Sequence, residues 1–167
     1  MIQIYSAREK GLSEADFERF YNIVVTAYAE TEAEMWGPGY VRVSWNDFRS
    51  FIAQDQILVA YLNQQVAGGI RYYPNADGTF GFGLFGADFS LSGKGVGRAL
   101  IQRVEEEVRR SGGTAIKIEI LRPRDFELPI KTILHAWYQR LGYQYTKTVG
   151  FAETFPDRAK GILVPCV

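Results

Sequence analysis

LSGKGVGRAL, residues 91–100, joins an apolar extended run to an amphipathic helix pattern and decides the fold of this chain. Glycines stand at three alternate positions, 93, 95 and 97. Glycine allows positive φ and close backbone approach, and the first turn of a helix has amides with no internal partner. These amides lie at the positive end of the helix dipole, flanked by Lys94 and Arg98. The stretch therefore predicts a site for a phosphate or pyrophosphate.

Two phosphate-binding motifs are excluded by the residues themselves. The nucleotide-triphosphatase loop needs Ser or Thr after its lysine, but Gly95 follows Lys94. The dinucleotide fingerprint needs a third glycine where Leu100 stands. Glu119 lies at about the distance expected for the carboxylate that binds the ribose in a dinucleotide fold. Such a fold needs two βαβ halves, however, and the fifty or so residues after Glu119 are too few for the second half. The glycine pattern alone does not choose the cofactor.

Composition favours one globular domain over residues 1–167. Lysines and arginines number 19, as do aspartates and glutamates, so no net charge favours nucleic acid or a membrane as a partner. The single cysteine, Cys166, excludes an intrachain disulfide, and with only one histidine, His135, we expect no metal site. The N-terminus has no signal-peptide pattern and no apolar run reaches transmembrane length, so we expect a cytoplasmic protein.

Hydrophobic periodicity predicts an α+β fold with a βαβ unit at its centre, whose two strands are parallel. Strands are expected over 2–6, 56–62, 66–73, 79–90, 114–121, 143–150 and 161–166. Four helices are expected to begin after Ser13, after Ser44, near Gly95 and near Leu128-Pro129. The last helix has an apolar stripe that should face inward: Ile130, Ile133, Leu134, Trp137, Tyr138 and Leu141.

The chain resembles the GNAT superfamily of acetyl-CoA-dependent N-acetyltransferases. Ser92-Gly93-Lys94-Gly95-Val96-Gly97 matches both small positions of that family's signature, and Trp137-Tyr138-Gln139-Arg140-Leu141-Gly142-Tyr143 matches its tyrosine motif. The resemblance spans essentially the whole chain. It implies a single N-acetyltransferase domain with a mixed, mostly antiparallel sheet of six to seven strands flanked by about four helices.

Two positions depart from the family pattern. Ser92 stands where the family usually has Arg or Gln, although the backbone amides of the loop remain. The Asn that often follows the fifth strand is missing from Leu121-Arg122-Pro123-Arg124-Asp125. Arg124 is our candidate for the lost cofactor contact. A subgroup of unassigned substrate shares the Pro-Arg after the strand and a Pro-Cys near the end, here Pro165-Cys166.

The resemblance implies acetyl-CoA as co-substrate, without a metal. In the family, one strand pairs its backbone with the pantetheine arm and one of its amides polarises the thioester carbonyl; Ala87 is the expected donor here. A plain buried strand would leave Gly81, Gly83 and Gly86 unexplained. The expected cofactor-binding residues are Phe85, Gly86, Ala87, Gly93, Lys94, Gly95, Val96, Gly97, Arg98 and Arg124.

By the same resemblance, Tyr138 is the general acid that protonates the coenzyme A sulfur, although an ordinary core tyrosine would occupy the same apolar stripe. The general base is open between Glu119 and Asp88, either of which could be a surface charge. Glu34, Trp36 and Tyr40 are expected to line the acceptor pocket, with Glu32 as an alternative carboxylate. A solvated acidic helix end with core aromatics is an equally good interpretation of that segment.

The predicted function is transfer of acetyl from acetyl-CoA to a primary amine by direct attack in a ternary complex. The acceptor is a small-molecule or peptide amine, and the enzyme is a monomer or homodimer. The alternative is a non-catalytic acyl-CoA-binding module with the same fold. Ser92 and the missing Asn favour that alternative, whereas Tyr138 and the intact glycines favour the enzyme.

Overall fold

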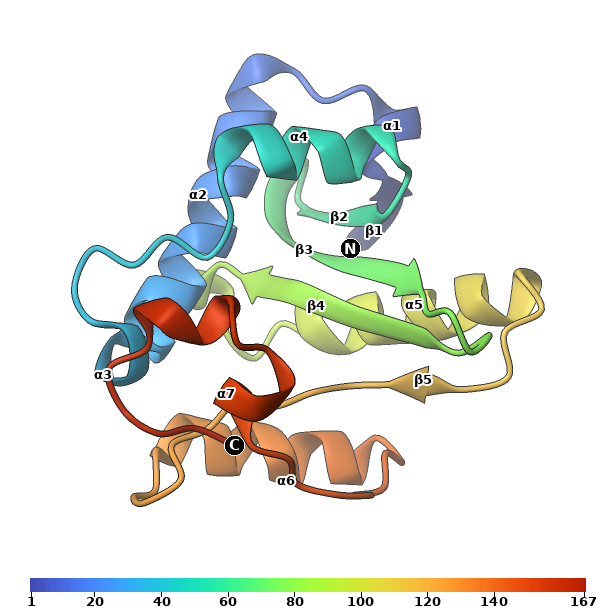
Figure 1. The fold of residues 1–167 in the computed structure, drawn as a ribbon. Helices are drawn as coiled ribbons and strands as arrows, with labels where there is room; N and C mark the ends of the chain where they lie inside the picture. Colours follow the sequence, from blue (N-terminus) through green and yellow to red (C-terminus); the bar gives the residue numbers. More distant parts are fainter. The chain divides into compact units, whose positions relative to one another are not determined.

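The computed structural model describes all of residues 1–167. The chain divides into two compact units (Figure 1). Unit 1 consists of Met1–Tyr28 and Val41–Ile118, and unit 2 of Ala29–Tyr40 and Glu119–Val167. Whether residues 1–167 behave as one domain stays a prediction.

All strands belong to one sheet in unit 1, in the order β1-β2-β3-β4-β5. Neighbouring strands from β1 to β4 are antiparallel, and β5 joins β4 in parallel. The α+β prediction and the parallel central pair are thereby confirmed, with five strands in place of six to seven. The strands are β1 (Ile2–Ser6), β2 (Ile57–Leu62), β3 (Gln65–Pro74), β4 (Phe80–Ala87) and β5 (Ile116–Lys117).

Four of the seven α-helices are long, and they are the four that the periodicity predicts. Ser13 and Ser44 cap two of them, accepting from the amides of Asp16 and Asp47 at 3.1 Å each. The long helices are α2 (Glu14–Thr31), α4 (Trp45–Ala53), α5 (Val96–Arg110) and α6 (Pro129–Arg140). The short ones are α1 (Ala7–Lys10), α3 (Ala33–Trp36) and α7 (Phe151–Thr154), with 3₁₀ turns η1 (Phe89–Leu91) and η2 (Arg158–Gly161).

Two predicted strands are wrong and one is shorter than expected. Residues 143–150 form no strand, and their side chains are largely exposed. Residues 161–166 form the end of η2 and a single bridge, Pro123–Cys166. Of residues 114–121, only β5 pairs with the sheet. An alternating pattern yields a strand only where a neighbour accepts its backbone hydrogen bonds over several residues. Residues 143–150 pair with no strand, and residues 161–166 have backbone partners only at isolated positions.

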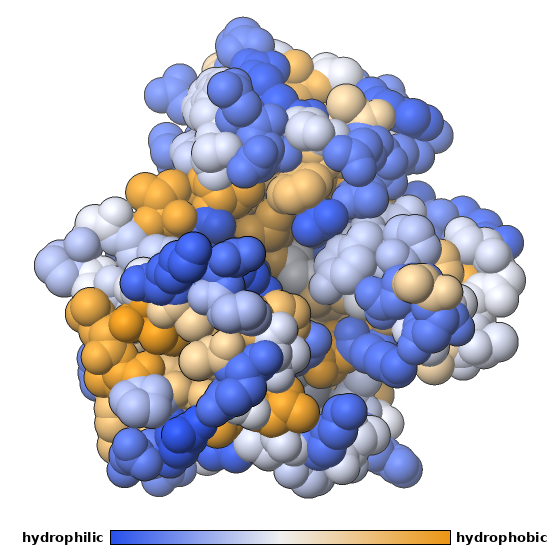
Figure 2. Space-filling model, in the orientation of Figure 1, coloured by the Kyte–Doolittle hydropathy of each residue, from blue (hydrophilic) through white to orange (hydrophobic).

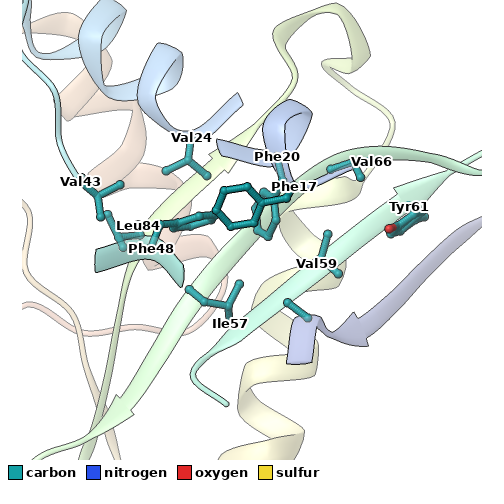
Figure 3. Close-up of a cluster of buried hydrophobic side chains, with 11 residues drawn as sticks. Phe17, Phe20, Val24, Val43, Phe48, Ile57, Val59, Tyr61, Val66 and Leu84 are labelled. Carbon is teal, nitrogen blue, oxygen red and sulfur yellow. The ribbon is translucent and has the colours of Figure 1, made fainter. Parts of the chain in front are cut away.

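The core of unit 1 is an aromatic cluster between the sheet and helices α2 and α4 (Figure 3). Phe20 of α2 meets Phe48 of α4 edge-to-face, with ring centroids 5.0 Å apart. Ile57 and Val59 of β2 and Leu84 of β4 complete this side of the cluster. Fully burying such side chains stabilises the fold by about 1.5–3 kcal/mol each.

A cross-strand glycine pair lets α2 lie directly on the sheet. Gly69 of β3 and Gly86 of β4 stand opposite one another. A Cβ at Gly69 would lie 2.1 Å from the Phe20 ring and 2.6 Å from the Leu58 carbonyl oxygen. A Cβ at Gly86 would lie 3.2 Å from the backbone of Val24. The absence of both side chains therefore fixes the height of α2 above β3 and β4.

Unit 2 has a smaller core made of Met35, Leu128, Phe151 and Cys166. Its C-terminal residues pair with the segment after β5: the Arg124 amide donates to the Pro165 carbonyl at 2.8 Å. The Pro-Arg and Pro-Cys features of the sequence are thus contact partners. Figure 2 shows hydrophobic surface over the region that Figure 1 draws as α3 and the C-terminal segment, where Leu163 is 65% exposed.

A buried ion pair joins two segments of unit 2 that are far apart in sequence. The Lys131 Nζ lies 2.5 Å from Oε2 of Glu32, and both side chains are less than a tenth exposed. The indole N–H of Trp36 donates to the other Glu32 oxygen at 3.1 Å. Both carboxylate oxygens are therefore satisfied, as burial of a charge requires.

This pair rotates α6 away from the expected orientation. Ile130 and Ile133 were expected to face inward, but they are 40% and 61% exposed. Lys131 and Tyr138 are the buried residues of the helix. The predicted inward stripe is therefore wrong at its first two positions. The helix buries Lys131, which has a carboxylate partner, in place of these two isoleucines.

We expect Gly69→Ala to lower the free energy of unfolding by about 1–3 kcal/mol, since the new methyl group would overlap Phe20 and a backbone oxygen. Gly83→Ala is the matched control in β4, because a Cβ there meets nothing within 4 Å. Chemical denaturation of both variants checks this. Equal stability of the two variants would contradict the close contact between α2 and β3.

We expect Lys131→Met to cost about 3–5 kcal/mol of stability, because it leaves the Glu32 carboxylate buried without its cation. The double variant Glu32→Gln, Lys131→Met removes both charges and should recover most of that loss. Denaturation of the two single variants and the double variant completes the cycle. Simple addition of the two single losses would show that the groups do not act as a pair.

Candidate functional site

Strand β4 has a bulge at its centre. Arg71 of β3 stands opposite Gly83 and Gly69 opposite Gly86, so two residues of β4, Leu84 and Phe85, face one of β3. Leu84 has φ +46°, a conformation that leucine rarely adopts. The amide of Phe85 leaves the sheet and donates to the Tyr28 hydroxyl at 3.1 Å. The bulge thus bends β4 just before residues 85–87.

The last residues of β4 have a strand neighbour on one side only. β5 pairs with β4 at Phe80 and Gly81 and no further. The Asp88 amide donates to the Ala67 carbonyl of β3 at 2.9 Å. Because successive amides of a strand point to opposite edges, the Ala87 amide points to the edge that β5 does not cover. That edge offers backbone donors and acceptors to an extended ligand.

The loop after β4 is held by Asp88. Its carboxylate accepts from the amide and hydroxyl of Ser90, at 2.9 and 2.7 Å, and from Arg19 at 3.0 Å. The Ser90 hydrogen bonds are the main cause that lowers the pKa of Asp88, and Arg19 lowers it further. A carboxylate stabilised in this way is a poor proton acceptor, so Asp88 fits a structural role better than that of general base.

Backbone conformation explains two of the three glycines in residues 91–100. Gly93 and Gly95 have φ +80° and +84°, where other residues are strained. Gly95 is the N-terminal cap of α5 and offers no side chain to the helix amides. Gly97 lies within the first turn of the helix. Glycine is therefore needed at 93 and 95 to shape the backbone of the loop.

This conformation leaves a group of amides without a protein acceptor. The first helical bond of α5 runs from the Ala99 amide to the Gly95 carbonyl, at 3.1 Å. The amides of Val96, Gly97 and Arg98 precede it and have no intrahelical acceptor. Lys94 and Arg98 are exposed beside them. Unsatisfied amides, a helix dipole and two cations together suit an anionic phosphate group.

Packing accounts for two of the three β4 glycines that the sequence left unexplained. Gly86 admits α2, and a Cβ at Gly81 would lie 2.9 Å from the Tyr73 ring. Only Gly83 faces open space with an ordinary φ. The glycines of β4 are therefore weaker evidence for a ligand than the sequence suggested. The bulge and the uncovered edge are the stronger evidence.

The expected catalytic tyrosine lies in unit 2, near the end of α6. Tyr138 is 7% exposed. Its ring lies 5.3 Å from that of Trp137 and meets Tyr143 edge-to-face at 6.0 Å. The Tyr143 amide donates to the Tyr138 carbonyl, closing the helix at Gly142. The tyrosine motif thus forms one packed aromatic helix end.

The other predicted site residues of unit 2 are more exposed. Glu119 lies outside any strand or helix with an exposed side chain. The Arg124 guanidinium is about half exposed and lies 3.9 Å from a Glu153 oxygen. These positions leave the roles of Glu119 and Arg124 as predictions.

The expected acceptor residues form a small aromatic group around α3. Trp36 stacks on Tyr40 with centroids 4.6 Å apart and planes 5° apart. Glu34 is exposed, whereas Glu32 is buried against Lys131. Of the two carboxylates considered for an amine, only Glu34 is therefore accessible.

The sequence did not indicate the role of Tyr28. Its place on the apolar face of α2 gave no sign that its hydroxyl would accept the Phe85 amide.

No group of three or more His, Cys, Asp or Glu side chains could hold a metal ion. No helix has the length and apolar character needed to cross a membrane.

Solved structures share this fold over most of the chain. An agmatine N-acetyltransferase in its apo form is 14% identical, covers 98% of this chain and 92% of its own, and has a TM-score of 0.67. A ribosomal-protein-alanine N-acetyltransferase from Brucella melitensis is 17% identical, with coverage of 90% and 88% and a TM-score of 0.64. The PaiA N-acetyltransferase from Thermoplasma acidophilum, solved with coenzyme A, is 15% identical, with coverage of 89% and 93% and a TM-score of 0.61.

At these identities the structures establish the fold, and no curated protein matches the sequence. The family assignment comes from the sequence itself: residues 53–145 match the model of the acetyltransferase (GNAT) domain, which is more than half of the chain. The matched range contains the bulged strand, the glycine loop, α5 and the tyrosine motif. The chain belongs to the GNAT acetyltransferase family.

Proposed function

We propose that this protein transfers acetyl from acetyl-CoA to a primary amine by direct attack within a ternary complex. The observation that carries the proposal is the group of unsatisfied amides at the start of α5, which follows a bulged strand with an uncovered edge. Family membership supports the same activity.

In this proposal unit 1 supplies most of the contacts with coenzyme A. The amides between Gly93 and Arg98 hold the pyrophosphate, and Lys94 and Arg98 neutralise its charge. The pantetheine arm lies along the β4 edge at residues 85–87, where its amides can pair as a strand would. Arg124 adds a cofactor contact. The similar PaiA N-acetyltransferase was solved with coenzyme A, which supports coenzyme A as the ligand.

The chemistry requires three things: a neutral amine, a donor for the tetrahedral oxyanion, and a proton for the departing thiolate. The amine nitrogen forms a bond to the thioester carbon, and the Ala87 amide stabilises the oxygen that becomes negative. Collapse of the intermediate breaks the C–S bond, and Tyr138 gives its proton to the sulfur. Glu119 takes the proton that the amine loses. Amines and thiols have reference pKa values of about 10 and 8.5, so both transfers gain from positioned groups.

The acceptor is a small-molecule or peptide amine, contacted by Glu34, Trp36 and Tyr40. The similar enzymes are named for acceptors as different as agmatine and a ribosomal protein. Release of coenzyme A thiol across a panel of amines tests the proposal directly. Saturable coenzyme A binding without release for any amine would instead indicate a non-catalytic acyl-CoA-binding module.

We expect Gly97→Val to abolish coenzyme A binding, because a branched side chain in the first turn of α5 would block access to the amides. Calorimetric titration with coenzyme A measures this. Gln102→Val, on the exposed face of the same helix, controls for the lower helix propensity of valine. Wild-type affinity in a folded Gly97→Val protein would remove this loop from the cofactor site.

We expect Tyr138→Phe to slow acetyl transfer by about 100-fold or more, the usual contribution of a general acid, with coenzyme A affinity nearly unchanged. Tyr143→Phe is the control, because its ring packs against Tyr138 within the same helix end. Turnover and thermal stability are measured on both variants. Intact turnover with a stability loss of about 1 kcal/mol would mark Tyr138 as structural.

A further inference from the structure

Unit 1 contains two arginines that stack on aromatic rings without a carboxylate partner. The Arg71 guanidinium carbon lies 3.7 Å from the ring centroid of Phe51 and 4.7 Å from that of Tyr73. Its Nε donates to the Gln56 side-chain oxygen at 2.8 Å. The two terminal nitrogens of the guanidinium are therefore available to a ligand. The Arg42 guanidinium carbon lies 5.3 Å from the ring centroid of Tyr28.

Both arginine side chains are partly buried. Burial is the main cause that lowers the pKa of Arg71; Tyr73 opposes this shift, and the positive charge of Arg42 adds to it. Neither arginine forms an ion pair with an aspartate or glutamate. Two partly desolvated like charges repel, and an anion between them would relieve that repulsion.

Arg49 shows the ordinary arrangement in the same unit. Its guanidinium carbon lies 4.1 Å from the Phe17 ring centroid, a stacking similar to that of Arg71. In contrast to Arg71, it has a carboxylate partner, Glu14, at 2.9 Å. Stacking on an aromatic ring therefore does not explain why Arg42 and Arg71 lack an anion.

Both arginines adjoin the bulge of β4. Arg71 stands directly opposite Gly83, where a Cβ would meet nothing within 4 Å. Arg42 stacks on Tyr28, whose hydroxyl accepts the Phe85 amide. Along β4 these contacts precede Ala87, whereas the phosphate-binding loop follows it. The arginines thus adjoin the part of β4 that precedes the proposed acyl position, whereas the amides proposed for the pyrophosphate follow it.

We propose that Arg42 and Arg71 bind a carboxylate of the acceptor, so that the acceptor amine is an amino acid or a peptide with a free carboxylate. Arginine suits this role because its planar fork matches a carboxylate with two parallel hydrogen bonds. This inference rests on the proposed acetyl transfer and adds its substrate class.

The test compares matched acceptors that differ only in the carboxylate. Amino acids, ω-amino acids and dipeptides are each assayed beside their carboxamides, with kcat/KM corrected for the fraction of neutral amine. The best acid should exceed its amide by about 10-fold or more, the size expected for a charge-assisted hydrogen bond. Equal rates for every pair, or faster transfer to the amides, would overturn the proposal.

Variants test whether Arg42 and Arg71 cause the preference for acids over carboxamides. Arg42→Gln and Arg71→Gln should each reduce the preference for the acid at least several-fold, mainly through KM, while transfer to the amides is little changed. Arg71→Lys keeps a cation and should retain part of the preference. Arg49→Gln, the stacked arginine with its own carboxylate, should retain all of it. A preference that survives both glutamine variants would overturn the assignment to these residues.

A binding measurement separates this proposal from the proposed function. Calorimetry of the coenzyme A-loaded protein with N-acetyl amino acids and N-acetyl dipeptides, and with their amides, needs no turnover. Tighter binding of the acids that is lost in Arg71→Gln supports the arginine site, whether or not any amine is acetylated. Absence of acetylation would contradict only the proposed acetyl transfer. Equal binding of acids and amides overturns the arginine site even if transfer occurs.

Discussion

The bulge at Leu84 is the constraint on which the proposed chemistry depends. A leucine in the left-handed region costs about 1–2 kcal/mol, so the surrounding structure must hold it there. Its side chain is buried in the aromatic cluster, and the amide of the next residue, Phe85, is satisfied by Tyr28. The extra residue bends β4, and beyond Gly81 the far edge of β4 has no strand neighbour. The edge of β4 at residues 85–87 is therefore uncovered beside a strained backbone, and strain of this kind is characteristic of functional sites.

Helix α2 packs against the bulge and against the core of unit 1. The pair Gly69 and Gly86 allows the helix to touch the sheet, and the height of the helix places the Tyr28 hydroxyl at the bulge. The same ring supports Arg42. Helix α2 therefore supplies a core contact, the hydroxyl that accepts the Phe85 amide and the ring on which Arg42 stacks. A change in how α2 packs would alter all three together, as expected for a close-packed interior.

Unit 2 is held by long-range polar contacts as well as by its small core. Glu32 and Lys131 are 99 positions apart in sequence, and Trp36 completes the hydrogen bonding of the carboxylate. The pair fixes α3, which carries the proposed acceptor residues, against α6, which carries Tyr138. A buried pair with every group satisfied specifies one orientation of α6, since any rotation would leave charges unpaired.

The sequence by itself determined the features that depend only on neighbouring residues. The glycine loop and the serine caps of α2 and α4 depend on residues within one or two helical turns, so spacing alone predicted them. Tertiary structure decided the rest: that Asp88 caps a turn, that Lys131 is buried, that residues 143–150 form no strand, and that Arg42 and Arg71 both adjoin the bulge of β4. Each of these depends on which distant residue supplies a partner, and burial and hydrogen bonding are satisfied only when the chain is folded.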